Sequence, residues 1–421
     1  MTGPARRLEI TSLSHAGEGV ARDAGRVVFV PFALPGETVR AEIVEEKKGL
    51  ARARLLEVLA PAPDRVTPRC PHYFSPPLPG SPAARLACGG CQLQHLAYPA
   101  QLAFKRQQVA DQLARVGGFA APPVRAVLAA PDPFGYRNQV QFALAPDGRL
   151  GFHAAGSSAI VPVRECPIAA PGLMDLFGQI RLESVPELDR LTLRAGAEGE
   201  RLIVFESASD APDLELDLPV SAALLRPDGA SLALAGRDDV VEVVKGRPFR
   251  ISAGSFFQVN TAMAGPLVDE ALAALALSGG ETVLDVYCGV GLFSAFMAPA
   301  AGRVIGIEAF EPAVDDAAVN LDEFDNVEIY AAPAEVVLPA LDVRADAVLV
   351  DPPRAGLATA ALDALLARRA PRLVYVACDP ATFARDARRL SAGGYRLEYV
   401  QPLDLFPQTY HVECVARFTA A

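Results

Sequence analysis

Residues 282–294 read TVLDVYCGVGLFS, and this stretch decides the fold of the carboxyl-terminal part of the chain. An apolar run carrying Asp285 leads into a turn with Gly289 and Gly291, and a helix-like segment follows. Glycines in such a turn let the backbone approach a ligand closely. Ser294 stands where the dinucleotide fingerprint has its third glycine, which disfavours a ligand with a pyrophosphate group. The stretch therefore favours a strand, turn and helix that bind adenosine without pyrophosphate.

The alternation of strand and helix continues from this stretch to the end of the chain. Apolar runs alternate with helix-like segments, and the expected strands are residues 282–288, 303–309, 327–331, 345–351, 372–378, 396–403 and 412–418. The pattern predicts an α/β fold, a Rossmann-like and doubly wound parallel sheet of seven strands that closes with an antiparallel pair. Sheets of this kind bind ligands beyond the carboxyl ends of their strands.

The amino-terminal and middle regions have other patterns. Short apolar runs separated by turns predict a small OB-like β-barrel, with strands at residues 8–13, 27–30, 37–44 and 51–58. Residues 45–54 read EEKKGLARAR and suit a hairpin that is either simply solvated or in contact with RNA. A proline-rich linker, a helix after Pro99 and mixed strands up to residue 250 indicate an α+β middle domain. We expect three domains, at residues 1–62, 63–250 and 251–421.

Charge and composition narrow the class of protein. The net charge of −11 argues against non-specific coating of nucleic acid. Residues 1–69 are the exception, because eleven Lys and Arg against nine Asp and Glu give them +2. Neither a membrane-spanning segment nor a secretory signal is visible, so we expect a cytoplasmic protein without a membrane partner.

Three reactive side chains end neighbouring strands of the expected sheet. Glu308 is placed to accept hydrogen bonds from both ribose hydroxyls of an adenosine, and the alternative is an ordinary carboxylate at a strand end that faces water. Asp351 precedes Pro352 and either binds a ligand or caps a turn. Cys378 precedes a helix, where the helix dipole gives a thiol thiolate character, although position alone favours an inert buried cysteine.

Four further cysteines have the spacing of a metal centre. Cys88 and Cys91 are separated by two residues, and Cys70 and Cys166 complete a possible set of four thiolates. Four thiolates suit zinc or an iron–sulfur cluster, and spacing alone does not choose between them. The nearby His72 and His95 are substitute zinc ligands, though each is better interpreted as an ordinary surface or core histidine.

The motifs in combination resemble those of one enzyme family. The strings DVYCGVGLFS, DPPRAGL, VACDPATFARD and HVECV occur in the order and strand positions of the RNA 5-methyluridine (uracil-5-)methyltransferases, closest to the bacterial 23S rRNA members. The amino-terminal barrel resembles their TRAM domain, and residues 254–260, GSFFQVN, look like the entry to their catalytic domain. The resemblance covers nearly the whole chain.

The resemblance implies a covalent mechanism. Carbon 5 of uracil is a poor nucleophile, so the family adds a cysteine, here Cys378, to carbon 6 and thereby makes carbon 5 electron-rich. After methyl transfer the proton on carbon 5 must leave, and the base that matches the family is Glu413. The uridine is expected to turn out of its stack into the pocket, with Phe256 and Phe257 as candidate platforms.

The resemblance also implies the cofactors and the partner. The residues matched to the S-adenosylmethionine site are Gln258, Tyr287, Glu308 and Asp351. A [4Fe-4S] cluster is implied on Cys70, Cys88, Cys91 and Cys166, although the seventeen residues between Cys70 and Cys88 exceed the gap usual in the family. The expected partner is 23S ribosomal RNA, bound by a monomer.

Other functions stay open at this point. The same chemistry on the T-loop uridine of tRNA is the main alternative, and an RNA-binding ribosome assembly factor without turnover is the non-catalytic one. An amino-methyltransferase has no use for Cys378 and Glu413. A radical methylthiotransferase needs three cysteines in C-x3-C-x2-C spacing, which the chain lacks.

Overall fold

A twisted sheet in the carboxyl-terminal part of the chain carries the reactive residues. The computed structural model describes residues 5–75, 86–145, 147–180, 182, 188–207 and 217–421. The strands of this sheet are β15 (Thr282–Val286), β16 (Arg303–Glu308), β17 (Val327–Ala331), β18 (Ala347–Val350), β19 (Arg372–Ala377), β20 (Tyr395–Leu403) and β21 (Glu413–Ala420). Their order is β17-β16-β15-β18-β19-β21-β20, with β21 antiparallel to both of its neighbours. The predicted Rossmann-like sheet of seven strands is confirmed.

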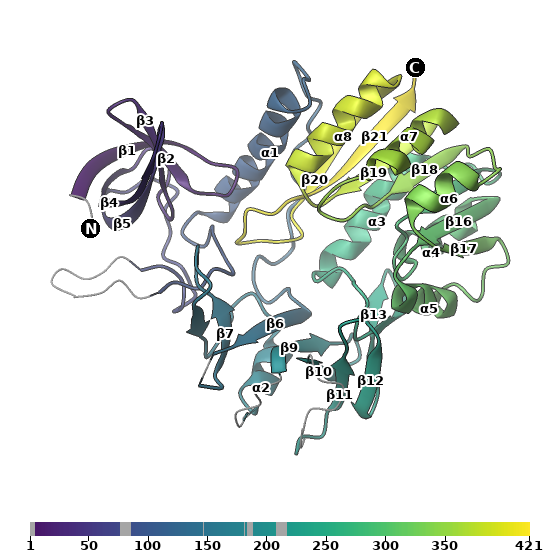
Figure 1. Cartoon of the computed structure of the whole chain (residues 1–421), viewed down its shortest axis with the longest axis horizontal. Coiled ribbons are helices and arrows are strands. Elements are labelled where there is room, and N and C mark those ends of the chain that lie inside the picture. Colours follow the sequence, from purple (N-terminus) through teal and green to yellow (C-terminus); the bar gives the residue numbers. More distant parts are fainter. Residues whose placement is uncertain (1–4, 76–85, 146, 181, 183–187, 208–216) are drawn as a thin grey trace. The chain divides into compact units, whose positions relative to one another are not determined.

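Helices cover both faces of this sheet (Figure 1). They are α3 (Thr261–Leu275), α4 (Leu292–Met297), α5 (Glu311–Asn320), α6 (Ala334–Ala340), α7 (Thr359–Arg368) and α8 (Pro380–Ala392). Side chains of α6, α7 and α8 share one buried apolar cluster with the strands, whereas α3, α4 and α5 pack on the other face. Covering both faces explains why the central strands are apolar at nearly every position.

The chain divides into two compact units, and the sheet lies in the second. The second unit comprises Lys105–Gln141, Ala169–Leu405 and His411–Ala421, and the first comprises Met1–Phe104, Phe142–Ile168 and Phe406–Tyr410. The predicted boundaries near residues 62 and 250 stay predictions.

The first unit begins with a closed barrel. Its strands are β1 (Ala5–Leu13), β2 (Gly19–Asp23), β3 (Arg26–Val30), β4 (Thr38–Lys47) and β5 (Leu50–Ala60), in the order β1-β2-β3-β5-β4. Alternate side chains such as Leu8, Ile10, Val28 and Leu55 fill the interior, and burial of each contributes about 1.5–3 kcal/mol. The expected barrel is confirmed, and β4 and β5 form the expected charged hairpin.

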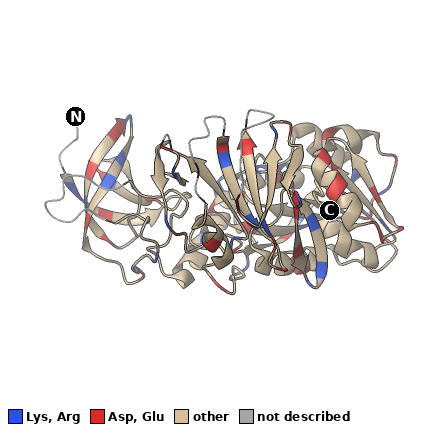
Figure 2. Ribbon diagram, turned by 90° about the horizontal axis from the view of Figure 1, so that it is seen from below, with Lys and Arg blue, Asp and Glu red and all other residues tan. Residues whose placement is uncertain are grey.

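The cations of the barrel are mostly paired with carboxylates. Arg26 pairs with Glu46 at 3.0 Å, Arg40 with Glu57 at 2.9 Å and Arg52 with Glu18 at 2.6 Å. Figure 2 shows Lys and Arg next to Asp and Glu along these strands. The net charge of +2 in this region therefore does not form a single basic face.

Shorter elements complete the two units. In the first unit β7 (Leu150–His153) pairs with β8 (Ile160–Pro162) and with the end of β6 (Gln139–Leu144). In the second unit the chain forms α2 (Pro171–Phe177), β9 (Leu188–Ala195), β10 (Arg201–Ser207), β11 (Ser221–Leu225), β12 (Ser231–Ala235), β13 (Asp239–Val244) and β14 (Arg247–Ser252). Helix α1 (Tyr98–Arg115) is the predicted amphipathic helix, and the chain passes from one unit to the other within it. Among the described residues, no helix is long and apolar enough to cross a membrane.

Candidate active site

The glycine turn after β15 has a backbone that most side chains disfavour. Tyr287, Gly289 and Gly291 all have positive φ, at 66°, 55° and 87°. A Cβ atom on Gly291 would lie 2.8 Å from the side chain of Leu321, so only glycine fits there. The amide of Tyr287 donates to the carbonyl of Ile307 at 2.8 Å, which ties the turn to β16. The turn is thus held open in the conformation expected of a ligand-binding loop.

Glu308 holds this turn from the end of β16. One carboxylate oxygen accepts from the amide of Gly289 at 3.0 Å, and the other accepts from Ala309 and Phe310 at 2.8 Å each. These three amides fix the orientation of the carboxylate. Its remaining lone pairs are available to two adjacent hydroxyl groups.

A buried carboxylic acid lies beneath the turn. Asp285 is fully buried and accepts a hydrogen bond from the hydroxyl of Ser294 at 2.6 Å, while its other oxygen has no partner among the described residues. Burial, and then the charge of Glu308, raise the pKa of Asp285 to about 7. The serine that stands in place of the third glycine therefore joins strand β15 to the first turn of α4.

The DPPR segment follows β18 at the same edge of the sheet. The amide of Asp351 donates to Val286 at 3.1 Å, which fixes it beside the glycine turn. Burial, with the charges of Asp285 and Glu308, raises the pKa of Asp351 to about 7. The sheet thus gathers three carboxylates where an S-adenosyl group with its positive charge is expected.

Cys378 and Glu413 meet at the next two strands. Cys378 follows β19, and Glu413 begins β21, in which it is 3% exposed. Asp379 caps α8 by accepting from Ala381 and Thr382 at 3.0 and 2.9 Å, so the thiol precedes a helix as expected. The charges of Glu413 and Asp351 both act on the thiol of Cys378. The structure therefore brings these three residues together.

The structure contradicts the expected thiolate character of Cys378. Burial is the largest cause, and with the charges of Glu413 and Asp351 it raises the pKa of Cys378 to about 12. Burial and Asp351 likewise raise the pKa of Glu413 well above its ordinary value. These effects outweigh the dipole of α8.

Arg354 is the cation of this site, and the sequence alone assigns it no role. It opposes burial by lowering the pKa of both Cys378 and Glu413. It also lowers the pKa of His411, which burial brings to about 4. The signal in the sequence is the arginine of the DPPR string itself. Only the fold places it near a glutamate that follows 59 residues later.

The GSFFQVN segment separates its two phenylalanines. Phe256 is 70% exposed, whereas Phe257 is buried against Phe249 at 5.9 Å between ring centroids. Gln258 is also buried, and its carbonyl accepts from Asn138 at 3.2 Å. Phe256 is therefore the one of the two aromatic rings that is accessible to a base.

The four cysteines matched to a cluster lie in the first unit. None of the seven cysteines forms a disulfide. The pKa of Cys91 is raised by burial first and then by Cys166, Cys88 and Cys70, so the four thiols are near neighbours. Burial raises the pKa of Cys88 to about 11. Among the described residues, however, no three His, Cys, Asp or Glu side chains lie close enough together to hold one metal ion.

The two histidines beside these cysteines have other partners. Nε2 of His72 accepts from the amide of Arg164 at 3.1 Å. Nδ1 of His95 lies 2.7 Å from the hydroxyl of Tyr73, and burial lowers its pKa to about 3. These contacts favour the interpretation as structural histidines. The proline-rich residues 76–85, which make the long gap after Cys70, lie outside the described residues.

Comparison with known proteins gives concordant matches. The family model described as tRNA (Uracil-5-)-methyltransferase matches residues 232–419, and that of the TRAM domain matches residues 1–56. An uncharacterized RNA methyltransferase of Thermosynechococcus vestitus is 37% identical over 100% of this chain and 99% of its own length. One of Gloeobacter violaceus is 38% identical over 99% and 96%.

A solved structure matches this chain over nearly its whole length. It is the Pyrococcus abyssi tRNA (uracil-54, C5)-methyltransferase in complex with S-adenosyl-L-homocysteine. The TM-score is 0.73 and the identity is 28%, over 98% of this chain and 100% of that one.

Proposed function

This chain belongs to the RNA (uracil-5-)-methyltransferase family, and we propose that it methylates carbon 5 of a uridine in 23S ribosomal RNA through a covalent adduct with Cys378. Membership makes it an RNA methyltransferase with S-adenosylmethionine as methyl donor. The observation that carries the proposed mechanism is that Cys378, Glu413 and Asp351 lie near one another at one edge of the sheet.

In this mechanism Cys378 adds to carbon 6 of the uracil and Glu413 later takes the proton from carbon 5. Because burial and Asp351 raise the pKa of Glu413, its carboxylate is a stronger base than an exposed glutamate. Loss of that proton restores the double bond between carbons 5 and 6 and expels the Cys378 thiolate. Arg354 favours the thiolate form of Cys378, which assists both the addition of this residue and its expulsion.

The methyl donor, when bound, supplies an electrophilic methyl group beside carbon 5. Glu308 is proposed to hold its ribose hydroxyls, because three backbone amides already fix this carboxylate at the glycine turn. Tyr287, Asp351 and Gln258 are proposed to complete the site. The acidic side chains suit a ligand with a sulfonium charge.

We also propose a [4Fe-4S] cluster on Cys70, Cys88, Cys91 and Cys166. The four thiols lie near one another, and thiols become deprotonated when they bind a metal centre. Each iron of a four-iron cluster takes one thiolate, so the ligands of a cluster lie farther apart than those of one ion. This difference reconciles four neighbouring thiols with the lack of a single-ion site among the described residues.

Iron content tests the cluster apart from activity. Anaerobically purified protein is expected to hold about four irons per chain and to absorb visible light. Cys91→Ser is expected to lose both, whereas Cys414→Ser, at a buried cysteine in the second unit, retains them. Unaltered protein that binds zinc and no iron would contradict the proposal.

The choice of target RNA is based on the barrel and the four cysteines. Bacterial members of the family that act on tRNA usually lack both, which favours 23S ribosomal RNA. A second candidate, the T-loop uridine of tRNA, is favoured by the solved tRNA (uracil-54, C5)-methyltransferase, which this chain matches over its whole length.

Mass spectrometry of separated RNA species decides between these targets. A deletion strain is expected to lose 5-methyluridine from 23S ribosomal RNA and to keep it in tRNA. The gene for the unaltered protein restores the modification, whereas Cys378→Ala does not. Loss from tRNA alone would contradict the ribosomal assignment.

A further inference from the structure

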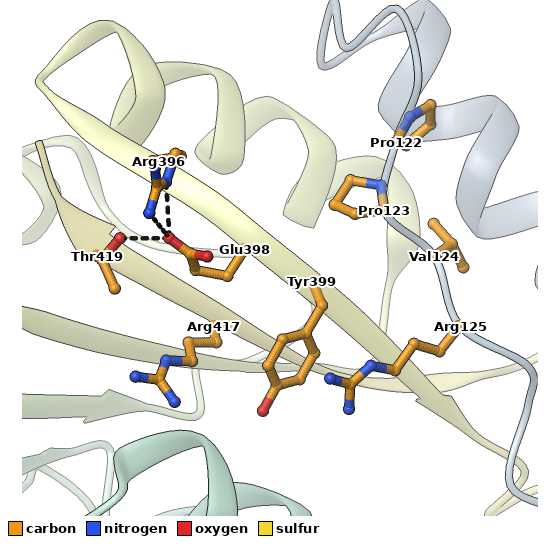
Figure 3. A pocket seen from close by; sticks show the side chains of 9 residues that line it. All are labelled: Pro122, Pro123, Val124, Arg125, Arg396, Glu398, Tyr399, Arg417 and Thr419. Atoms are coloured by element: carbon orange, nitrogen blue, oxygen red, sulfur yellow. Dashed lines mark hydrogen bonds and ion pairs between the residues drawn. The ribbon is translucent and has the colours of Figure 1, made fainter.

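A polar pocket lies on the edge of the sheet in the second unit, apart from the candidate active site (Figure 3). Residues 122–124 line it together with Arg125, Arg396, Glu398, Tyr399, Arg417 and Thr419. Its volume is about 630 Å³. We call it the edge pocket, and neither Cys378 nor the glycine turn lines it.

The edge pocket is built by a segment that extends the sheet beyond β20. The amide of Val400 donates to Pro123 and that of Arg125 donates to Val400, both at 2.9 Å. In the sheet, Arg396 pairs with Thr419 and Tyr399 pairs with Arg417, so these four side chains share one face. Arg125 is therefore placed by backbone hydrogen bonds beside side chains of two strands.

The charges in the edge pocket do not cancel. Glu398 accepts from Arg396 at 2.7 Å and from Thr419 at 2.6 Å, and these bonds lower its pKa. Arg125 and Arg417 form no ion pair with any carboxylate in the part of the chain that the structure describes. Three arginines against one glutamate leave a surplus of positive charge in a protein of net charge −11.

An aromatic ring completes the arrangement. The guanidinium of Arg125 lies over the ring of Tyr399, 3.5 Å from its centroid. Figure 3 shows Tyr399 between Arg125 and Arg417. Guanidinium groups bind phosphate oxygens in pairs, and the ring of Tyr399 holds one of the two guanidinium groups in place. The arrangement matches a phosphodiester group of a single-stranded RNA.

We propose that the edge pocket binds a phosphodiester of the substrate RNA at a nucleotide flanking the target uridine. Glu413 and Arg417 lie four residues apart on the same face of β21, which is about 13 Å along the strand. A strand whose uridine reaches Cys378 can therefore place a neighbouring phosphate between Arg125 and Arg417. The proposal rests on the proposed function, because RNA methylation supplies the strand.

The test measures RNA affinity and methyl transfer separately. The double variant Arg125→Gln/Arg417→Gln is compared with Arg303→Gln/Arg389→Gln, which removes the same charge from exposed ion pairs with Glu328 and Asp363. The probe is a fluorescein-labelled dodecamer of uridine, titrated at several salt concentrations. Melting temperature and S-adenosylhomocysteine affinity show that each variant is folded.

The edge-pocket variant is expected to bind the dodecamer roughly tenfold more weakly at 0.1 M salt, with a salt slope smaller by about 0.7 for the one lost phosphate contact. The control variant should match the unaltered protein. Equal RNA affinity of the two variants would overturn the proposal, as would no binding by the unaltered protein.

Two further measurements complete the test. The first distinguishes an RNA site from a site for free anions, and the second tests the methylation reaction separately from RNA binding at the edge pocket. Loss of inorganic pyrophosphate binding with RNA affinity unchanged would identify a site for free anions and would overturn the RNA assignment. Methyl transfer by the unaltered protein to unmodified 23S transcript tests the proposed function by itself. Its failure leaves the comparison of RNA affinities intact.

Discussion

Asp285 offers a quantitative test of how the cofactor turn is built. Its burial raises the pKa from 3.8 to about 7. Each unit of pKa corresponds to about 1.4 kcal/mol, so ionising this carboxyl in the folded protein costs about 4 kcal/mol. A raised carboxyl pKa means that the folded state binds the proton more tightly than the unfolded state. The contribution of Asp285 to stability is therefore greatest below about pH 4, falls as the pH rises to about 7, and is constant above that.

The variant Asp285→Asn removes this dependence. Between pH 5 and pH 8 the free energy of unfolding of the unaltered protein should fall by about 2–3 kcal/mol more than that of Asp285→Asn. In Asp285→Asn an amide nitrogen replaces one carboxylate oxygen, and the unpaired oxygen position of Asp285 has no hydrogen-bond partner among the described residues. A buried polar atom without a partner lowers the free energy of unfolding at both pH values. Comparing the change between the two pH values cancels this constant cost.

Urea unfolding at the two pH values measures the difference. Asp363→Asn is the matched control, because that aspartate is exposed and pairs with Arg389. The control should follow the unaltered protein. Equal pH dependence in Asp285→Asn and the unaltered protein would refute the assignment of a buried acid with a raised pKa.

Three other predictions follow from named contacts. Glu308→Gln should weaken S-adenosylhomocysteine binding in calorimetry by about 10- to 100-fold, as expected for loss of charged hydrogen bonds, and unchanged affinity would exclude the proposed ribose contact. Arg354→Gln should shift the acid limb of the pH–rate profile to higher pH by about one unit, because Arg354 lowers the pKa of both Cys378 and Glu413. An acid limb that does not shift would exclude that role. Lys105→Met should lower the free energy of unfolding in urea by about 3–5 kcal/mol, because it leaves the buried Asp404 unpaired. The double variant Lys105→Met/Asp404→Leu should recover most of this stability, and equal losses in the two variants would contradict the pairing.

The sheet was predictable because its strands are buried on both faces. Strands such as β18 and β19 are continuous apolar runs, which stand out in any sequence. Strand β2 was missed for the opposite reason, because its sequence GVARD is short and partly polar, and its assignment depends on its pairing with β1 and β3.

The members of the candidate site could be proposed from the sequence, whereas its electrostatics could not. Glu308, Asp351 and Cys378 stand out because they follow or end apolar strands on one edge of the sheet, whereas Glu413 was proposed from the family resemblance. The direction in which the pKa of Cys378 shifts depends on burial and on Glu413, and neither can be inferred from the residues next to Cys378 in the sequence. The edge pocket is likewise invisible in the sequence, since it depends on the hydrogen bonds between Arg125 and Val400.

The most direct test of the central claim is a covalent trap. Fluorine at carbon 5 of uracil cannot leave as a proton, so an RNA that contains 5-fluorouridine should stop the reaction after methyl transfer. With S-adenosylmethionine present, the unaltered protein is predicted to form a conjugate that survives denaturation and maps by mass spectrometry to Cys378, while Cys414→Ser still forms it and Cys378→Ala does not. Methylation of the unfluorinated RNA without any such conjugate from its fluorinated counterpart would contradict the account.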